Sequence, residues 1–198
     1  MSAGTKKWIT VVGMGEDGLD GISPAARQLI ETAQVLAGDK RHLTKVPRGD
    51  EERLDWKDGF DTAFDEIARH EGRRVVVLAS GDPLHYGVGA NIVRRFGADQ
   101  VNVIPAPGAF SLVAADLGWP LADIKCLTVH GRALEAVTLY LTPGRRLLVL
   151  SWDGETPEKL AGLLTTRGFG PSRITVLGNL GGDDETRTEG TAEKWTGG

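Results

Sequence analysis

The sequence predicts an α/β protein in which strands and helices alternate, and three observations favour this class. Short runs rich in β-branched residues, of which 75–78 is the clearest, alternate with longer segments whose apolar residues follow helical spacing. Glycine accounts for 27 of the 198 residues, and single glycines end the apolar runs, as tight turns between strands and helices require. Alternation of this kind implies right-handed crossovers and a largely parallel sheet.

The elements of the first half follow in order along the chain. Ser23 and Pro24 mark the start of the first helix, because serine is a favoured N-cap and proline fits the first helical turn. Residues 44–58 are polar and irregular, and we expect an exposed connection there with at most one short strand. The expected strands are 8–12, 35–38, 73–79 and 101–104, and the expected helices are 24–33, 60–70 and 87–96.

A stretch rich in proline and glycine at 105–108 predicts a domain boundary, with domains at 1–106 and 107–198. The second half is expected to repeat the alternation. Its predicted strands are 127–129, 146–150 and 174–177, and its predicted helices are 109–117, 133–141 and one from Pro157. After Asn179 the chain becomes polar, so we expect no final apolar strand and only the start of a helix at Thr191.

Composition excludes several classes of function. Acidic residues (27) exceed lysine plus arginine (23), which disfavours a general nucleic-acid binder. The lone cysteine, Cys126, excludes an internal disulfide and a zinc site of several thiolates, and we expect it to be a buried apolar residue. No apolar run approaches the ~18 residues that cross a bilayer. We expect a cytoplasmic protein with no metal site, and a solvated acidic turn at 183–185.

Residues 13–18 fit the pattern G-x-G-x-x-G after a predicted strand, which would suit an NAD-dependent oxidoreductase with Asp39 on the ribose. Two features argue against a dinucleotide. The helix signal at Ser23 comes well after the last glycine, so no helix N-terminus faces the loop. Glu16 and Asp17 stand where a pyrophosphate needs positive potential, and no neighbouring lysine or arginine offsets them. The oxidoreductase therefore remains an alternative, as does a non-catalytic scaffold domain.

The loop from Ser80 to Gly87 follows the most hydrophobic strand and precedes a helix. Ligands of open α/β sheets bind at the carboxyl ends of strands. Gly81 would allow a ligand to approach the backbone, and Asp82 would accept a hydrogen bond from a ribose hydroxyl or an ammonium group. The alternative is an ordinary loop with Asp82 as a helix N-cap. The loop alone does not choose between the two.

The Gly-Asp-Pro loop at 81–83 and the Gly-x-Gly loop together resemble the tetrapyrrole methylases, which are class III S-adenosylmethionine-dependent methyltransferases. Further stretches at 104–112, 117–120, 129–132, 169–173, 177–182 and 189–192 resemble the carbon-5 module of the precorrin-6Y C(5,15)-methyltransferases. The resemblance runs in order from about Ile9 to Ala192. One departure is Glu16–Asp17, where relatives often carry a proline turn.

The resemblance implies two α/β domains with S-adenosylmethionine in the cleft between them and S-adenosylhomocysteine as product. It implies methylation of a precorrin at carbon 5 in cobalamin biosynthesis, with another ring carbon as the alternative. A candidate for the proton transfer is His85, unless it only caps or packs the next helix. Candidate cofactor contacts are Glu16, Ser80, Gly81, Asp82, Pro83, Phe110, Ser111, Ser151, Trp152 and Leu180, and candidate contacts to the substrate carboxylates are Arg41, His42, Tyr86, His130 and Arg132.

The resemblance also implies partners. Family members are commonly homodimers, and some carry the carbon-5 module fused to a methyltransferase that acts at carbon 15 and decarboxylates. The polar end of this chain suggests a module cut from such a fusion. We expect a tetrapyrrole substrate, and no nucleic acid or membrane partner.

Overall fold

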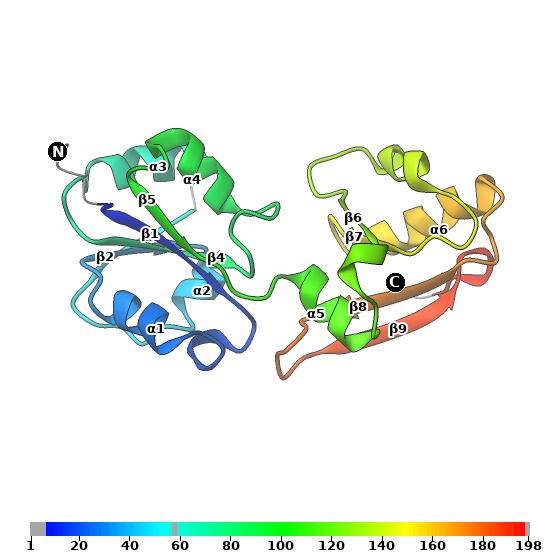
Figure 1. The fold of residues 1–198 in the computed structure, drawn as a ribbon, viewed down its shortest axis with the longest axis horizontal. Coiled ribbons are helices and arrows are strands. Elements are labelled where there is room, and N and C mark those ends of the chain that lie inside the picture. Colours follow the sequence, from blue (N-terminus) through cyan, green and yellow to red (C-terminus); the bar gives the residue numbers. More distant parts are fainter. Residues whose placement is uncertain (1–6, 57–58, 197–198) are drawn as a thin grey trace. The chain divides into compact units, whose positions relative to one another are not determined.

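The computed structural model describes residues 7–56 and 59–196, and it divides the chain into two compact units, Met1–Gly108 and Ala109–Gly198 (Figure 1). The division falls two residues after the boundary expected from the sequence. Residues 57 and 58, at the end of the expected polar connection, lie outside the described residues.

Within residues 7–56 and 59–108, five parallel strands form one sheet in the order β3-β2-β4-β1-β5. The central strands are buried on both faces, which explains why they read as continuous apolar runs in the sequence. The strands are β1 (Ile9–Met14), β2 (Val35–Gly38), β3 (Glu52–Asp55), β4 (Val75–Ser80) and β5 (Val101–Ile104).

Helices cover both faces of this sheet (Figure 1). Helices α1 (Pro24–Glu31) and α2 (Lys40–Leu43) pack on the face that carries Val12, Met14 and Leu78, and the Ser23 hydroxyl accepts a hydrogen bond from the Ala26 N–H at the start of α1. Helices α3 (Phe60–Ala68) and α4 (Val88–Phe96) pack on the opposite face. The helices that follow the neighbouring strands β1 and β4 therefore lie on opposite faces of the sheet. The carboxyl ends of β1 and β4 thus form a topological switch point.

In the described part of the second unit, four strands form two small sheets. Strands β6 (Lys125–Thr128) and β7 (Leu147–Leu150) are parallel, whereas β8 (Arg173–Gly178) and β9 (Thr186–Thr191) are antiparallel. Helices α5 (Ala109–Asp116) and α6 (Thr156–Thr166) pack against these sheets. Within the described ranges, the 3-10 segments are η1 (Gly18–Asp20), η2 (Leu121–Asp123), η3 (Leu134–Tyr140) and η4 (Ala192–Lys194).

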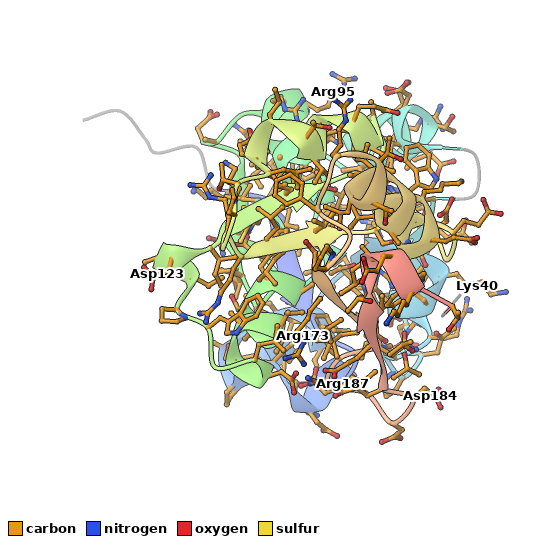
Figure 2. All side chains as sticks on the ribbon, turned by 90° about the vertical axis from the view of Figure 1, so that its right-hand side faces the viewer. Lys40, Arg95, Asp123, Arg173, Asp184 and Arg187 are labelled. Carbon is orange, nitrogen blue, oxygen red and sulfur yellow. The ribbon has the colours of Figure 1, made fainter. Side chains whose placement is uncertain are left out.

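The structure differs from the sequence prediction at several elements. Strand β9 was not expected, because its sequence is polar throughout. Arg187 on β9, labelled in Figure 2, donates hydrogen bonds to Glu189 on the same strand and to Asp116 at the end of α5. The expected helix at 133–141 is the 3-10 segment η3, and the helix expected at Thr191 is the short segment η4. Cys126 is half-buried rather than buried.

Among the described residues, no helix combines the length and the apolar character needed to cross a membrane.

Candidate functional site

The carboxyl ends of β1 and β4 and the segment after β5 lie against one another at the switch point. The Gly81 N–H donates a hydrogen bond to the Met14 carbonyl at 2.9 Å, and the Ala106 N–H donates to the Gly81 carbonyl at 3.1 Å. A Cβ at Gly13 would lie 1.9 Å from the Gly81 oxygen, and one at Gly81, where φ is +50°, would lie 2.7 Å from the Gly108 Cα. Only glycine permits this close approach of three backbone segments.

The Gly-x-Gly loop leads into the short 3-10 segment η1, and α1 begins six residues after Gly18, at Pro24. The N-terminus of α1 therefore does not follow directly on the loop glycines, as a dinucleotide fingerprint requires.

The Gly-Asp-Pro loop forms a turn held by Asp82. Its Oδ1 accepts a hydrogen bond from the Leu84 N–H at 2.9 Å, and its carbonyl accepts one from the His85 N–H at 3.1 Å. Helix α4 is instead capped at Gly87, so the interpretation of Asp82 as the N-cap is wrong. Pro83 is buried against the start of α4, close to Gly87. The loop is thus fixed by its own turn.

His85 and Tyr86 lie exposed on the same loop. Their rings stack with centroids 4.9 Å apart, and Tyr86 has a φ of +61°. A bulky residue in the left-handed region is uncommon, and such outliers concentrate at functional sites. Because His85 is exposed, it does not pack in the core beneath α4.

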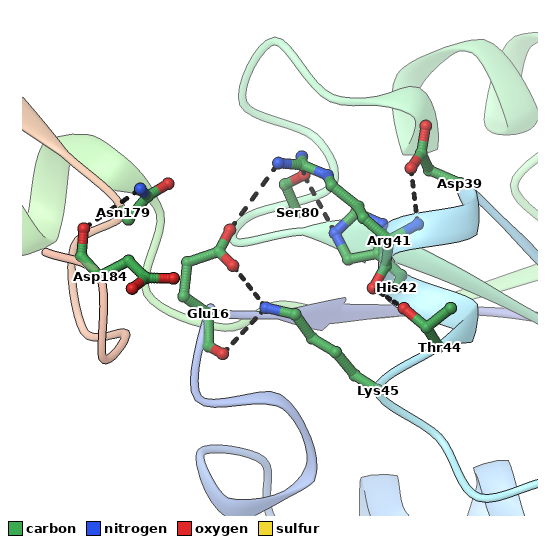
Figure 3. Close-up of polar contacts among 9 residues, drawn as sticks. All are labelled: Glu16, Asp39, Arg41, His42, Thr44, Lys45, Ser80, Asn179 and Asp184. Atoms are coloured by element: carbon green, nitrogen blue, oxygen red, sulfur yellow. Dashed lines mark hydrogen bonds and ion pairs between the residues drawn. The ribbon is translucent and has the colours of Figure 1, made fainter.

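A polar cluster lies where β1, β2 and β4 end (Figure 3). Arg41 Nη2 donates a hydrogen bond to Ser80 Oγ at 2.5 Å, and Arg41 Nη1 lies 3.7 Å from Glu16 Oε1. Lys45 Nζ donates both to the Glu16 carboxylate and, at 2.8 Å, to the Glu16 carbonyl. The hydrogen bond from Lys45 is the main reason that the pKa of Glu16 lies below its ordinary value.

This cluster corrects one expectation. The sequence suggested that no cation offsets the carboxylate of Glu16, but the fold brings two cations from the segment after β2 to it. Lys45 was not among the predicted site residues. Its signal was only its position in a basic segment after a strand end, because nothing in the sequence paired that segment with the first loop.

His42 follows Arg41 on α2 and is 5% exposed. Its Nε2 lies 3.3 Å from Ser80 Oγ. Burial, followed by the charge of Arg41, lowers the pKa of His42 from 6.5 to about 4, so the imidazole is neutral at pH 7. The Asp39 carboxylate accepts a hydrogen bond from the Arg41 N–H at 2.9 Å and thereby fixes the start of α2.

In the second unit, the carboxyl ends of β6 and β7 carry an aromatic pair. Because the register places Thr128 beside Leu150, His130 and Trp152 follow neighbouring strand ends, and their rings stack with centroids 5.2 Å apart. Trp152 is 55% exposed. Ser151 Oγ donates a hydrogen bond to the Asp153 carbonyl at 2.6 Å, and Arg132 lies exposed two residues after His130.

The remaining candidate residues are placed by α5 and by the β8–β9 turn. On α5, Phe110 is buried and Ser111 is exposed. Leu180 is half-buried and follows Asn179, whose φ is +51° and whose side-chain amide donates to the Asp184 carbonyl. Asp183 to Glu185 are exposed, as expected. The residues that the structure describes contain no group of three or more histidine, cysteine or acidic side chains that could hold a metal ion.

Comparison with known proteins identifies relatives along nearly the whole chain. Residues 8–195 match the family model of the tetrapyrrole (corrin/porphyrin) methylases. The chain is 43% identical over 191 residues to a precorrin-6Y C(5,15)-methyltransferase (decarboxylating) of Sinorhizobium sp, a match that covers 95% of this chain and 46% of that protein. It is 36% identical over 179 residues to the cobalt-precorrin-7 C(5)-methyltransferase of Salmonella typhimurium, covering 89% of this chain and 87% of that protein.

Solved structures share the fold. The precorrin-6Y methylase of cobalamin biosynthesis from Archaeoglobus fulgidus superposes with a TM-score of 0.71 at 24% identity, over 94% of this chain and 90% of that one. The uroporphyrin-III C-methyl transferase of Thermus thermophilus, in complex with S-adenyl homocysteine, superposes with a TM-score of 0.66 at 20% identity, over 93% and 83% of the two chains. The chain spans about half the length of the curated precorrin-6Y relatives that it matches. From the family match and these identities, the chain belongs to the tetrapyrrole (corrin/porphyrin) methylase family and has its fold.

Proposed function

We propose that the chain transfers a methyl group from S-adenosylmethionine to carbon 5 of a precorrin macrocycle in cobalamin biosynthesis. One observation carries the choice of carbon. The chain covers half of a relative that is named for carbons 5 and 15, and it aligns with most of a relative that is named for carbon 5 alone. Carbon 5 is the atom that the two names share. Methylation at another ring carbon of the pathway is the nearest alternative.

The proposed cofactor is S-adenosylmethionine, which supplies a methyl group on a sulfonium. The chemistry of the candidate residues fits such a group. Asp82 is a partly exposed carboxylate that suits an ammonium or a ribose hydroxyl, and the exposed indole of Trp152 suits the flat adenine. The other proposed contacts are Glu16, Ser80, Gly81, Pro83, Phe110, Ser111, Ser151 and Leu180.

The proposed substrate carries many carboxylates, so its contacts need cations although the chain is acidic overall. Arg41, Arg132, His130 and Tyr86 are exposed and are proposed to contact it. The protein contributes mainly by holding the ring carbon in line with the methyl group. The proposed proton acceptor is the exposed His85.

Cellular context and assembly are proposed on the same basis. We place the protein in the cytoplasm and propose a homodimer, with association or fusion to a carbon-15 methyltransferase and decarboxylase. The support for the last partner is a relative about twice as long whose name covers both carbons.

Calorimetric titration with S-adenosylhomocysteine, with NAD as the control ligand, tests the cofactor class. We expect saturable one-to-one binding of S-adenosylhomocysteine and no binding of NAD. Asp82→Ala should weaken binding about tenfold or more, because a hydrogen bond to a charged group is worth about 1.5–3 kcal/mol. The control variant Asp61→Ala, on α3, should bind like the wild type. Binding of NAD alone would refute the proposal.

Methyl transfer from ¹³C-labelled S-adenosylmethionine tests the carbon. The product should show the label at carbon 5 by NMR, and a label elsewhere on the ring would favour the alternative.

A further inference from the structure

Ser80 Oγ is the centre of the polar cluster in the first unit, and its hydrogen bonds can be assigned one by one. Arg41 Nη2 lies 2.5 Å from this oxygen. A guanidinium group can only donate, so one lone pair of Ser80 Oγ accepts from Arg41. A hydroxyl also has a second lone pair and one proton. Whether His42, the remaining neighbour, donates to that lone pair or accepts the proton depends on which of its ring nitrogens is protonated.

The surroundings of His42 indicate which of its ring nitrogens carries the proton. Nδ1 is buried and has no hydrogen-bond partner within the described parts of the chain, whereas Nε2 faces Ser80 Oγ at 3.3 Å. A buried N–H without an acceptor is rare and costly, more so than an unused lone pair. The proton therefore belongs on Nε2, which donates it to the second lone pair of Ser80 Oγ.

Burial keeps this arrangement fixed near neutral pH. Burial first, and the charge of Arg41 next, lowers the pKa of His42 to about 4. The ring therefore carries one proton at pH 7, and only its position is to be decided.

We propose that His42 is a positioning residue that, together with Arg41, makes the Ser80 hydroxyl a hydrogen-bond donor only, directed at a carboxylate oxygen of the bound ligand. With both lone pairs filled, the hydroxyl proton points to neither neighbour. Ser80 is exposed, so a ligand can reach that proton. The guanidinium beside it favours an oxygen that carries negative charge. The sequence suggested that His42 contacts substrate directly, whereas its burial leaves it this indirect role.

The inference rests on the proposed function, because both of its small molecules carry carboxylates. S-adenosylmethionine has one on its amino-acid group, and a precorrin has several on its ring. The chemistry of the partner is the same in both cases, and the choice of probes distinguishes them.

Two variants of His42 separate the donor from the volume of the ring. His42→Gln keeps an N–H that can reach Ser80, whereas His42→Leu fills similar space without one. The probes are S-adenosylhomocysteine, 5′-methylthioadenosine, which lacks the amino-acid group, and uroporphyrin, a stable tetrapyrrole polycarboxylate. We expect His42→Leu to weaken the binding of one carboxylate probe about fivefold, as for the loss of one hydrogen bond. The affinity of His42→Gln for the same probe should stay within about twofold of the wild type.

The pattern across probes identifies the source of the carboxylate. Weaker binding of S-adenosylhomocysteine with unchanged methylthioadenosine binding assigns Ser80 to the cofactor, and weaker binding of uroporphyrin alone assigns it to the substrate. Ser80→Ala should show the same loss, and the double variant with His42→Leu should be no worse than Ser80→Ala alone. Equal losses in His42→Leu and His42→Gln, or wild-type binding in both, would overturn the proposal.

A measurement without ligand tests the arrangement itself. The chain has four histidines, and ¹⁵N spectra of their rings report which nitrogen is protonated. The signal that disappears in His42→Gln belongs to His42 and should show the Nε2–H form at pH 7. An Nδ1–H form would overturn the arrangement even if the protein binds its cofactor. A wild-type protein with that Nε2–H form that binds neither S-adenosylhomocysteine nor uroporphyrin would instead refute the proposed function and, with it, the ligand.

Discussion

Gly13, the penultimate residue of β1, occupies a backbone position that admits no side chain. An alanine Cβ there would lie 1.9 Å from the carbonyl oxygen of Gly81 and 2.7 Å from the Ala106 nitrogen, both of which are main-chain atoms that cannot rotate away. We expect Gly13→Ala to lower the free energy of unfolding by about 1–3 kcal/mol, the usual range for overpacking. Denaturant unfolding measures this loss. In Gly154→Ala the new Cβ meets nothing within 4 Å, and an equal loss there would contradict the explanation.

His42 should make stability depend on pH. In the folded protein its pKa is about 4, against 6.5 ordinarily, chiefly because the ring is buried. Arg41 and Lys45 lower the pKa further, whereas Asp39 and Glu16 raise it. The unfolded chain therefore binds this proton more readily. The stabilisation is complete above pH 6.5 and is lost as the pH falls toward 4.

Chemical denaturation of the wild type and of His42→Gln at pH 7.5 and pH 4.5 measures this contribution. On acidification, the wild type should lose about 2–3 kcal/mol more than the variant, at about 1.4 kcal/mol per pKa unit. Parallel losses in the two proteins would show that His42 does not titrate in this window.

At the same scale, the sequence located the loops but not the contacts between them. Ser80, Arg41 and Glu16 were all candidates through the family resemblance, which assigned Ser80 and Glu16 to the cofactor and Arg41 to the substrate. Their meeting with Lys45 depends on β2 and β1 both lying beside β4, and this strand order is not encoded in any local pattern.

Helix α6 begins with a side-chain cap from outside the helix. Asp153 Oδ1 accepts hydrogen bonds from the N–H groups of Glu155 and Thr156 at 3.0 and 2.9 Å and from the Thr156 hydroxyl at 2.9 Å. The pKa of Asp153 lies below its ordinary value, chiefly because of the hydrogen bond from the Thr156 side chain. Asp153→Ala should therefore lower the midpoint of thermal unfolding, because the N–H groups of Glu155 and Thr156 lose their side-chain acceptor.

The same helix offers a change of opposite sign as the control. Gly162 lies inside α6, and a Cβ there meets nothing within 4 Å. Gly162→Ala should raise stability by about 0.5–1 kcal/mol. If the unfolding midpoints of both variants shifted in the same direction, the midpoint would not be reporting the stability of α6.

Most elements of the first unit were predictable because buried parallel strands are continuous apolar runs, as in β4, where five of six residues are buried. Strand β9 was not predictable in this way. Its exposed residues are threonine, arginine and glutamate, so the sequence shows no apolar pattern there. The segment is a strand because it pairs with β8. The short helix α2 was missed because four residues are too few to show a period.

At the scale of the molecule, the first unit has its own complete core. Both faces of its sheet are covered by helices of the same unit, and most residues of its central strands are buried. A chain that ends at Gly108 should therefore unfold cooperatively by itself. Circular dichroism during thermal unfolding of that fragment measures this. A broad transition without a plateau would show that the unit needs the rest of the chain.

The strand order also has a consequence for biosynthesis. Strand β1 leaves the ribosome first, yet it pairs only with β4 and β5, and Ile9 and its partner Val101 are 92 positions apart. At about 5–20 residues per second, roughly 5–20 s pass before both neighbours of β1 have been made. Strand β4 is complete at Ser80, so in the last part of this interval β1 can pair on one side only. The arrangement that brings the loops after β1 and β4 together therefore leaves one side of β1 without its native neighbour until β5 has emerged.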